Sequence, residues 1–472
     1  MLYEKRDILG KLFFGISILI LIYMFISPLT NTILHIDEYW TYSLVNLPFI
    51  QGMTVAIHDV HPPLYYLILY PFSFIHPNFY IFKALSIVPY LLVIIVSFTK
   101  IRKDYGWLTA GLFVFCIGIM SDFFMEFLTM RMYSWGLFFV LMSFIYYMDV
   151  IRYWDRKSWV LLTFFTLCAA YTQYFFAITC ALIYLLLLVH ILRENRDKLR
   201  QFAKSIVALI LLFGPWSVVL LHQISGQNDE FHQAMDWSTV PNYLTYFAIK
   251  SNSYNLEMIA LKIAAVALLV LVLMIAYKNR DKFAIDGVFL MYGTILLGFF
   301  ALFLAINTMR VRYLVPALAL FWLSASMVIG RIEDNRILAV ALFLIVVLAG
   351  ASVAINHEDF TDCVDFNDKK ANFLNSINNN ETVVVYNTDY GYKVLHNDLN
   401  NTSKQYTLSG RYFYDNDVEV TKNLNKVLSK YPDKDVYLVN WRAKEANKQF
   451  EKNYNLTKKY DAGHYKFYLV AH

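Results

Sequence analysis

The stretch LFFGISILILIYMFISPLTNTILHIDEYW, residues 12–40, decides the fold class of this chain. Residues 12–33 form an apolar run, and roughly 20 apolar residues are enough for a helix to cross a bilayer. Two adjacent carboxylates, Asp37 and Glu38, follow almost without a spacer. Because no small-residue cleavage site separates the two parts, we expect a retained membrane helix rather than a signal peptide, with both carboxylates at a membrane surface.

The composition extends this interpretation to the whole chain. Of 472 residues, 58% are hydrophobic and only 16% are charged, and the mean hydropathy is +0.44. These values exclude an ordinary soluble domain and predict a polytopic membrane protein. The four cysteines form no pattern typical of a disulfide scaffold or a zinc site. The net charge of +5 is spread over short loops and does not indicate a nucleic-acid partner.

Clusters of Lys and Arg recur along the chain, and such clusters mark cytoplasmic loops. Placing every cluster inside predicts about eleven transmembrane helices and a cytoplasmic N-terminus. The expected helices cover residues 12–33, 80–99, 107–121, 132–150, 159–173, 176–192, 203–221, 257–277, 284–306, 312–330 and 337–355. No Lys or Arg occurs from Leu12 to Phe82, so we expect residues 34–79 to form an external loop. The run at 62–75 then predicts a juxtamembrane or re-entrant helix, with a further crossing as the alternative.

The chain divides into two expected domains, a membrane domain over 1–356 and an external domain over 357–472. Beyond residue 356 the composition shifts to Asn, Asp, Lys and Tyr. Short apolar runs at 382–387, 435–440 and 465–470 predict strands, and helical spacing appears at 421–430 and 443–454. We therefore predict a small α/β domain outside the membrane.

Polar residues of the membrane domain gather on the external side of this topology. A carboxylate at a helix end is most often a solvated cap, and an arginine there can snorkel to lipid phosphates. These ordinary roles do not explain why so many polar residues face one compartment. The set comprises Asp37, Glu38, His58, Asp59, His61, Asp122, Glu126, Arg131, Gln173, His222, Gln223, Asp229, Glu230, His232, Asp236, Arg310 and Arg312.

This arrangement suits transfer of a group from a lipid-linked phosphate. Negative charge grows on the leaving phosphate, and the planar fork of arginine matches phosphate oxygens. The acceptor hydroxyl needs a carboxylate base within hydrogen-bond reach. A site at the outer leaflet would admit the lipid from the side and the acceptor from outside.

The motifs that carry these residues resemble a known family. They are DEYWTY after the first helix, HPPLYY, MRMYSW at 130–135, YTQYFF at 171–176, GPW at 214–216 and RYLVPAL at 312–318. Their order resembles the GT-C glycosyltransferases of the protein O-mannosyltransferase and aminoarabinose-transferase type, over roughly residues 1–330. The resemblance implies a GT-C-like membrane fold, a polyprenyl-phosphate sugar donor and inversion at the anomeric carbon.

The resemblance also implies roles for individual residues. Asp37 would be the catalytic base, with Glu38 as its support. His61 stands where the aminoarabinose-transferase pattern has Lys and would face the donor phosphate; imidazole makes such binding pH-dependent. Arg131 with Arg312, or Arg310 in its place, would complete the phosphate site. We place the following residues in the donor or acceptor pocket: Asp59, Glu126, Tyr133 and Gln173, the last standing where many relatives have His.

The sequence thus predicts an integral-membrane glycosyltransferase at the outer face of a bacterial cell membrane. The expected acceptor is a cell-wall polymer, a glycolipid or a protein. No cofactor is firmly implied, and a divalent metal bridging Asp37, Asp59 and His61 stays an alternative. A flippase of lipid-linked sugars is the competing function, although no internal repeat supports it. An ion channel or a purely structural protein would leave the external polar residues without a purpose.

Overall fold

The computed structural model describes residues 2–30, 36–75, 78–120, 123–225, 237–304, 311–387, 395, 399–408, 419–421, 423–441, 454–461 and 465–471. The chain forms two compact units. The membrane unit comprises Met1–Thr32 and Val45–Glu358, and the C-terminal unit comprises Ile33–Leu44 and Asp359–His472. Residues 33–44, which follow the first membrane helix, therefore belong to the same unit as the C-terminal residues.

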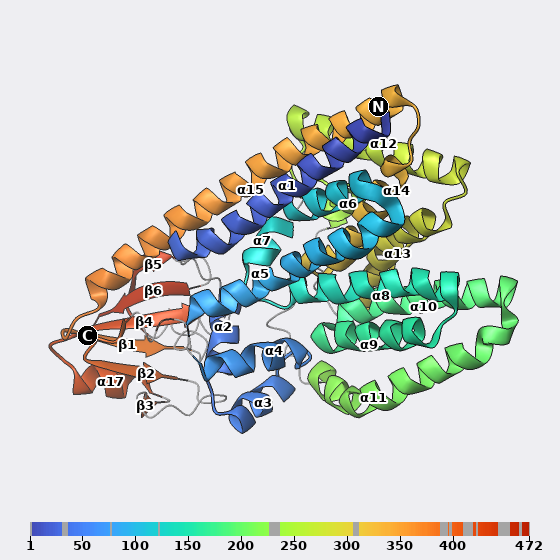
Figure 1. The fold of residues 1–472 in the computed structure, drawn as a ribbon. Coiled ribbons are helices and arrows are strands. Elements are labelled where there is room, and N and C mark those ends of the chain that lie inside the picture. Colours follow the sequence, from blue (N-terminus) through green and yellow to red (C-terminus); the bar gives the residue numbers. More distant parts are fainter. Residues whose placement is uncertain are drawn as a thin grey trace. The chain divides into compact units, whose positions relative to one another are not determined.

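Within the described residues, each segment predicted as a membrane helix contains a helix (Figure 1). The helices are α1 (Leu2–Thr30), α5 (Phe79–Val96), α6 (Arg102–Ile119), α8 (Tyr133–Tyr153), α9 (Arg156–Thr172), α10 (Tyr174–Glu194), α11 (Leu199–Ser225), α12 (Leu256–Lys278), α13 (Lys282–Leu304), α14 (Val315–Gly330) and α15 (Asn335–Ile377). Within the described residues, eight stretches are long and apolar enough to cross a membrane, with Phe79–Ile119 counted as one. The protein is a multi-pass membrane protein.

Several helices differ from their predicted limits. A turn of π-helix at Ser97–Ile101 joins α5 to α6, and the backbone then turns at Gly106, whose φ of 88° favours glycine. Helix α15 continues to Ile377, well beyond the predicted end at residue 355. Hydropathy marks where a helix leaves the apolar layer, whereas the residues after 356 still include good helix formers.

Short helices fill the segment between α1 and α5. They are α2 (Ile36–Val45), α3 (Phe49–Ile57) and α4 (Leu64–Ser73). The ten residues of α4 extend over about 15 Å, half of the hydrocarbon thickness of a bilayer. The run at 62–75 is therefore no crossing, and the prediction of a short helix there is confirmed.

Close helix packing places the long helices of the membrane unit. Helices α8, α9 and α10 lie side by side (Figure 1). Helix α14 is buried from Val315 to Ile329. A Cβ atom added at Gly111 would come within 2.0 Å of the Gly10 carbonyl oxygen, so α1 and α6 meet backbone to backbone.

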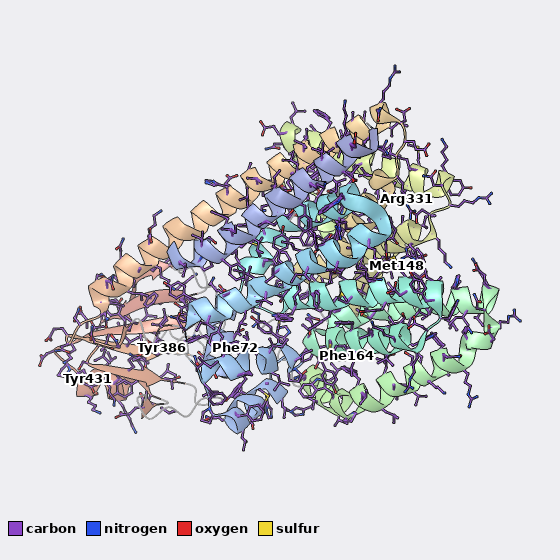
Figure 2. The ribbon with its side chains drawn as sticks, in the orientation of Figure 1. Phe72, Met148, Phe164, Arg331, Tyr386 and Tyr431 are labelled. Atoms are coloured by element: carbon purple, nitrogen blue, oxygen red, sulfur yellow. The ribbon has the colours of Figure 1, made fainter. Side chains whose placement is uncertain are left out.

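Ion pairs join the helix ends that carry the basic clusters. Lys100 Nζ lies 2.8 Å from an Asp149 carboxylate oxygen, and Arg152 donates to Asp104 over 3.0 Å. Arg331 (Figure 2), at the end of α14, bonds Asp281. These contacts join α8 to α6 and α14 to the start of α13.

The C-terminal unit contains a six-stranded mixed sheet of order β3-β2-β1-β4-β6-β5. The strands are β1 (Thr382–Tyr386), β2 (Lys404–Thr407), β3 (Glu419–Val420), β4 (Asp435–Trp441), β5 (Leu456–Asp461) and β6 (Tyr465–Val470). Strands β1 to β4 pair in parallel, whereas β6 is antiparallel to both β4 and β5. The three predicted strands and the helix at 421–430 are confirmed, the latter as α17 (Leu424–Lys430). The helical pattern at 443–454 lies almost entirely outside the described residues.

Alternating side chains give this sheet two apolar faces. The end of α15, with Leu374 and Ile377, covers the face that contains Tyr386 of β1 (Figure 2). Helix α17 covers the opposite face through Leu424 and Val427. The predicted fold class, a helical membrane protein with a small α/β domain, is confirmed.

Candidate active site

The loop between α3 and α4 carries the first site residues. Asp59 is half-buried and accepts a 2.6 Å hydrogen bond from the Tyr66 hydroxyl. His61 is buried at 8% exposure and directly precedes Pro62 and Pro63, and Pro63 caps the start of α4. The proline pair starts the helix without needing a backbone N–H group, so the loop can present Asp59 and His61 while α4 carries Tyr66.

Tyr66 remains a neutral hydrogen-bond donor at this site. Burial raises the pKa of its hydroxyl, and the neighbouring Asp59 carboxylate raises that pKa further. The positive charge of Arg131 acts on the same pKa and lowers it. A cation therefore lies close to the Asp59–Tyr66 pair.

Arg131 comes from the turn between α7 (Phe123–Leu128) and α8. Its side chain is 3% exposed, and Glu126 nearby in the chain is 8% exposed. The charges of Arg131 and Glu126 both interact electrostatically with the phenol of Tyr133, which is the first residue of α8. Since Arg131 also acts on Tyr66, the structure brings the HPPLYY and MRMYSW motifs to one place.

Arg312 lies much later in the sequence than Arg131 and also lies beside Tyr133. Its guanidinium lies 5.2 Å from the centre of the Tyr133 ring, within the range of a cation–π contact. The next residue, Tyr313, stacks on Phe175 with ring centres 5.0 Å apart. The buried Tyr133 hydroxyl has no hydrogen-bond partner among the described residues. Two arginines, Arg131 and Arg312, thus surround one buried phenol.

Gln173 lies at the border of this cluster. It is 4% exposed and caps the start of α10, where its side-chain oxygen accepts from the Phe175 amide. This bond holds the backbone of Phe175, the residue on whose ring Tyr313 stacks. The structure gives Gln173 a capping function, while its predicted place in the pocket stays a prediction.

A polar clamp fixes the loop that carries Asp59. The Gln223 side chain, near the end of α11, donates to the carbonyls of Ala56 and Ile57 over 3.3 and 3.0 Å. It accepts from the Tyr174 hydroxyl over 2.6 Å, and that hydroxyl accepts from Trp216 over 3.0 Å. The C-terminal end of α3 is thereby tied to α10 and α11.

Several of these residues lie outside the sequence prediction. Tyr66 and Tyr174 occur in motifs quoted above without a role, and Gln223 is one more polar residue of an outer loop. Lys83 of α5 is 6% exposed and donates to the Leu128 carbonyl over 3.4 Å. It is the first basic residue after Lys11, at the predicted outer end of a helix, and that position is the signal that could have revealed it.

The two adjacent carboxylates lie in the C-terminal unit. Both occupy the first turn of α2. Glu38 is fully buried, whereas Asp37 is half-buried, and the Asp37 carbonyl accepts a 3.0 Å bond from the Thr41 hydroxyl. Arg310 lies outside the described residues. Within the residues that the structure describes, no group of three His, Cys, Asp or Glu side chains is placed to hold a metal ion.

An apolar groove lies on the membrane unit between α1 and α5. Its volume is about 220 Å³. The lining residues are Phe25, Pro28, Leu29, Tyr80, Ile81, Ala84 and Ile87. They come from the C-terminal end of α1 and the N-terminal half of α5, the helix that also carries Lys83.

Comparison with known proteins bears on the fold. No family model and no curated protein matches the sequence. A crystal structure of ArnT from Cupriavidus metallidurans in the apo state is similar, with a TM-score of 0.54, 11% identity and 87% of each chain covered. ArnT from the same organism bound to undecaprenyl phosphate gives a TM-score of 0.50, 13% identity and 97% of each chain covered. The chain therefore has an ArnT-like fold, as the motifs predicted.

Proposed function

We propose that the protein is an integral-membrane glycosyltransferase that moves a sugar from a polyprenyl phosphate to an acceptor hydroxyl. The observation that carries the proposal is the pair of arginines around Tyr133. Arg131 is almost fully buried, and Arg312 packs its guanidinium over the ring. Buried or half-buried cations on the predicted outer side of a membrane protein indicate a functional site, and the planar guanidinium group matches the oxygens of a lipid phosphate.

The fold and the groove support the same donor. ArnT, whose fold the chain shares, is known in a form bound to undecaprenyl phosphate. The groove between α1 and α5 is lined by apolar side chains, which suits the hydrocarbon chain of a polyprenyl donor. A flippase would bind the same lipid, but no described feature favours translocation over transfer.

The proposed reaction follows from these residues. The acceptor hydroxyl oxygen attacks the anomeric carbon of the sugar and gives its proton to the Asp37 carboxylate. The bond between that carbon and the phosphate oxygen breaks, and polyprenyl phosphate leaves. Arg131 and Arg312 stabilise the negative charge that grows on the phosphate, and His61 contributes when it is protonated. Attack opposite to the leaving group inverts the anomeric configuration.

Turnover of a defined donor tests the proposal. Purified protein in lipid nanodiscs is incubated with synthetic polyprenyl-phosphate sugars and a cell-envelope fraction that supplies acceptor hydroxyls, and released polyprenyl phosphate is measured. We expect release from at least one sugar donor, and loss of release in Asp37→Asn without loss of the folded protein. Asp433→Asn, an exposed carboxylate of the C-terminal unit, serves as the matched control.

The competing outcomes are distinct. Movement of an intact donor across a vesicle membrane, without release of polyprenyl phosphate, would favour a flippase. Near-normal release by Asp37→Asn would reject Asp37 as the base while keeping the transferase. We further propose that the N-terminus is cytoplasmic and that the C-terminal domain is extracellular.

A further inference from the structure

Helix α2 is divided between the two units of the structure. Residues up to Leu44 belong to the C-terminal unit, and Val45 begins the next segment of the membrane unit. Asp37 and Glu38 stand in the first turn of this helix. The carboxylate pair is therefore part of the same compact unit as the soluble sheet, although more than 300 residues of membrane sequence separate them.

Tyr39 attaches α2 to the soluble fold. Its ring packs against the core cluster that contains Leu374, Tyr386 and Phe467. The Lys370 ammonium lies 5.6 Å from the centre of the same ring, within the range of a cation–π contact. Lys370 is 8% exposed, on the part of α15 that covers the sheet. The ring is thus held between an apolar core and a buried cation.

Helix geometry links this attachment to Asp37. Successive residues of an α-helix project about 100° apart, so Asp37 projects roughly opposite to Tyr39, which lies two positions later. Glu38, between them, is fully buried, whereas Asp37 is half-buried. With Tyr39 fixed against the soluble core, the direction of Asp37 is fixed away from that core.

We propose that the C-terminal domain holds helix α2 in place, with Tyr39 and Lys370 as positioning residues that set the orientation of Asp37. The inference rests on the proposed glycosyltransferase function and adds a role for the soluble domain within it. Neither Tyr39 nor Lys370 touches substrate in this account. They act through α2, and a misplacement of about 1 Å at a reacting group can lower a rate up to about a hundredfold.

The test compares substitutions at these two positions in the full-length protein. Lys370→Met removes the cation and should lower kcat by at least about tenfold, with the KM for the donor unchanged because Arg131 and Arg312 are intact. Lys370→Arg keeps a cation over the ring and should retain most of kcat. Lys369→Met removes an exposed neighbouring charge and should match the wild type.

Tyr39 gives a second, independent pair. Tyr39→Phe keeps the ring and should keep kcat, whereas Tyr39→Leu should lower kcat as Lys370→Met does. Folding of Lys370→Met is judged by gel filtration and thermal unfolding in detergent. If this variant fails to fold, the comparison of Tyr39→Phe with Tyr39→Leu tests the positioning role instead. Binding of polyprenyl phosphate to each variant reports that the membrane unit is intact.

The results separate this inference from the proposed function. Wild-type protein that releases no polyprenyl phosphate from any sugar donor would reject the function. Wild-type release together with an unchanged kcat in folded Lys370→Met or folded Tyr39→Leu would reject the positioning role alone. A rise in donor KM at constant kcat would equally overturn it, because that change indicates a donor-binding role.

Discussion

At the scale of single residues, Arg131 and Arg312 both interact with the side chain of Tyr133. Tyr133 has Arg312 over its ring, and the charge of Arg131 acts on its phenol. Its hydroxyl is buried and has no hydrogen-bond partner within the described part of the chain. An unpaired buried donor lowers stability, and we propose that this hydroxyl donates to the substrate.

The Tyr133 hydroxyl can be tested by its removal. Tyr133→Phe should leave thermal stability unchanged or raise it by about 1 kcal/mol, since no bond to the protein is lost. Donor turnover should fall about tenfold, because a buried phenol beside two cations would donate to a phosphate oxygen. Both quantities are measured on the same purified variant.

Tyr147→Phe on the same helix is the matched control. The Tyr147 hydroxyl donates to Asp286 over 2.7 Å, so its removal should destabilise the protein by about 1–3 kcal/mol. A Tyr133→Phe protein that is as destabilised as this control but fully active would contradict the substrate contact.

His61 predicts a pH dependence of donor binding. Only the protonated imidazole attracts the phosphate electrostatically, so the donor KM should rise as the pH increases from about 5.5 to 7.5. His61→Lys keeps the charge throughout this range and should give a flat profile. His58→Ala, at an exposed position nearby, should behave as the wild type. Parallel slopes for His61→Lys and the wild type would exclude His61 from the phosphate site.

At the scale of elements, the candidate site residues lie in the loops and turns directly before the helices. The loop before α4 carries Asp59 and His61, the turn before α8 carries Arg131, and a short 3-10 turn, Val311–Tyr313, before α14 carries Arg312. The long helices fix the positions of these loops and turns through packing. The Gln223 clamp adds a polar connection between α3 and the pair α10 and α11.

The clamp should stabilise the loop at residues 58–63. Gln223→Leu leaves the Ala56 and Ile57 carbonyls and the Tyr174 hydroxyl without this partner, which should lower stability by about 1–3 kcal/mol. Hydrogen exchange of the amides of residues 58–61 should become faster than in the wild type. Gln201→Leu, exposed near the start of the same helix, is the control. Unchanged exchange in Gln223→Leu would show that the clamp does not hold this loop.

At the scale of the whole molecule, the charge pattern predicts the sidedness of the two units. The basic clusters are joined by ion pairs such as Lys100–Asp149 on one side, whereas the site residues come from the loops predicted on the other. The odd number of predicted crossings predicts that the C-terminal domain lies outside.

Cysteine labelling in intact cells tests this sidedness. In a background without Cys116, Cys168, Cys180 and Cys363, a membrane-impermeant maleimide should label Lys426→Cys and leave Asp197→Cys unlabelled until the cells are opened. Both positions are exposed in the structure. Labelling of Asp197→Cys before lysis would reverse the proposed orientation.

The sequence by itself determined the elements of this protein. Hydropathy and residue spacing are local properties, so the apolar runs predicted the membrane helices and alternation predicted β1, β4 and β6. The same local signals could not predict that α15 continues to Ile377, because helix formation does not stop where hydropathy does. They also left the run at 62–75 undecided until α4 proved to have ten residues.

Only the tertiary structure decided which residues act together. The sequence supplied Asp59, Glu126, Arg131, Tyr133 and Arg312 as candidates, and folding gathers them with Tyr66, which had no predicted role. Gln223 meets Ala56 across 167 residues, and Tyr39 packs against the core formed by the C-terminal strands. Such contacts depend on how distant helices and strands pack, and no periodicity within a single segment carries that information.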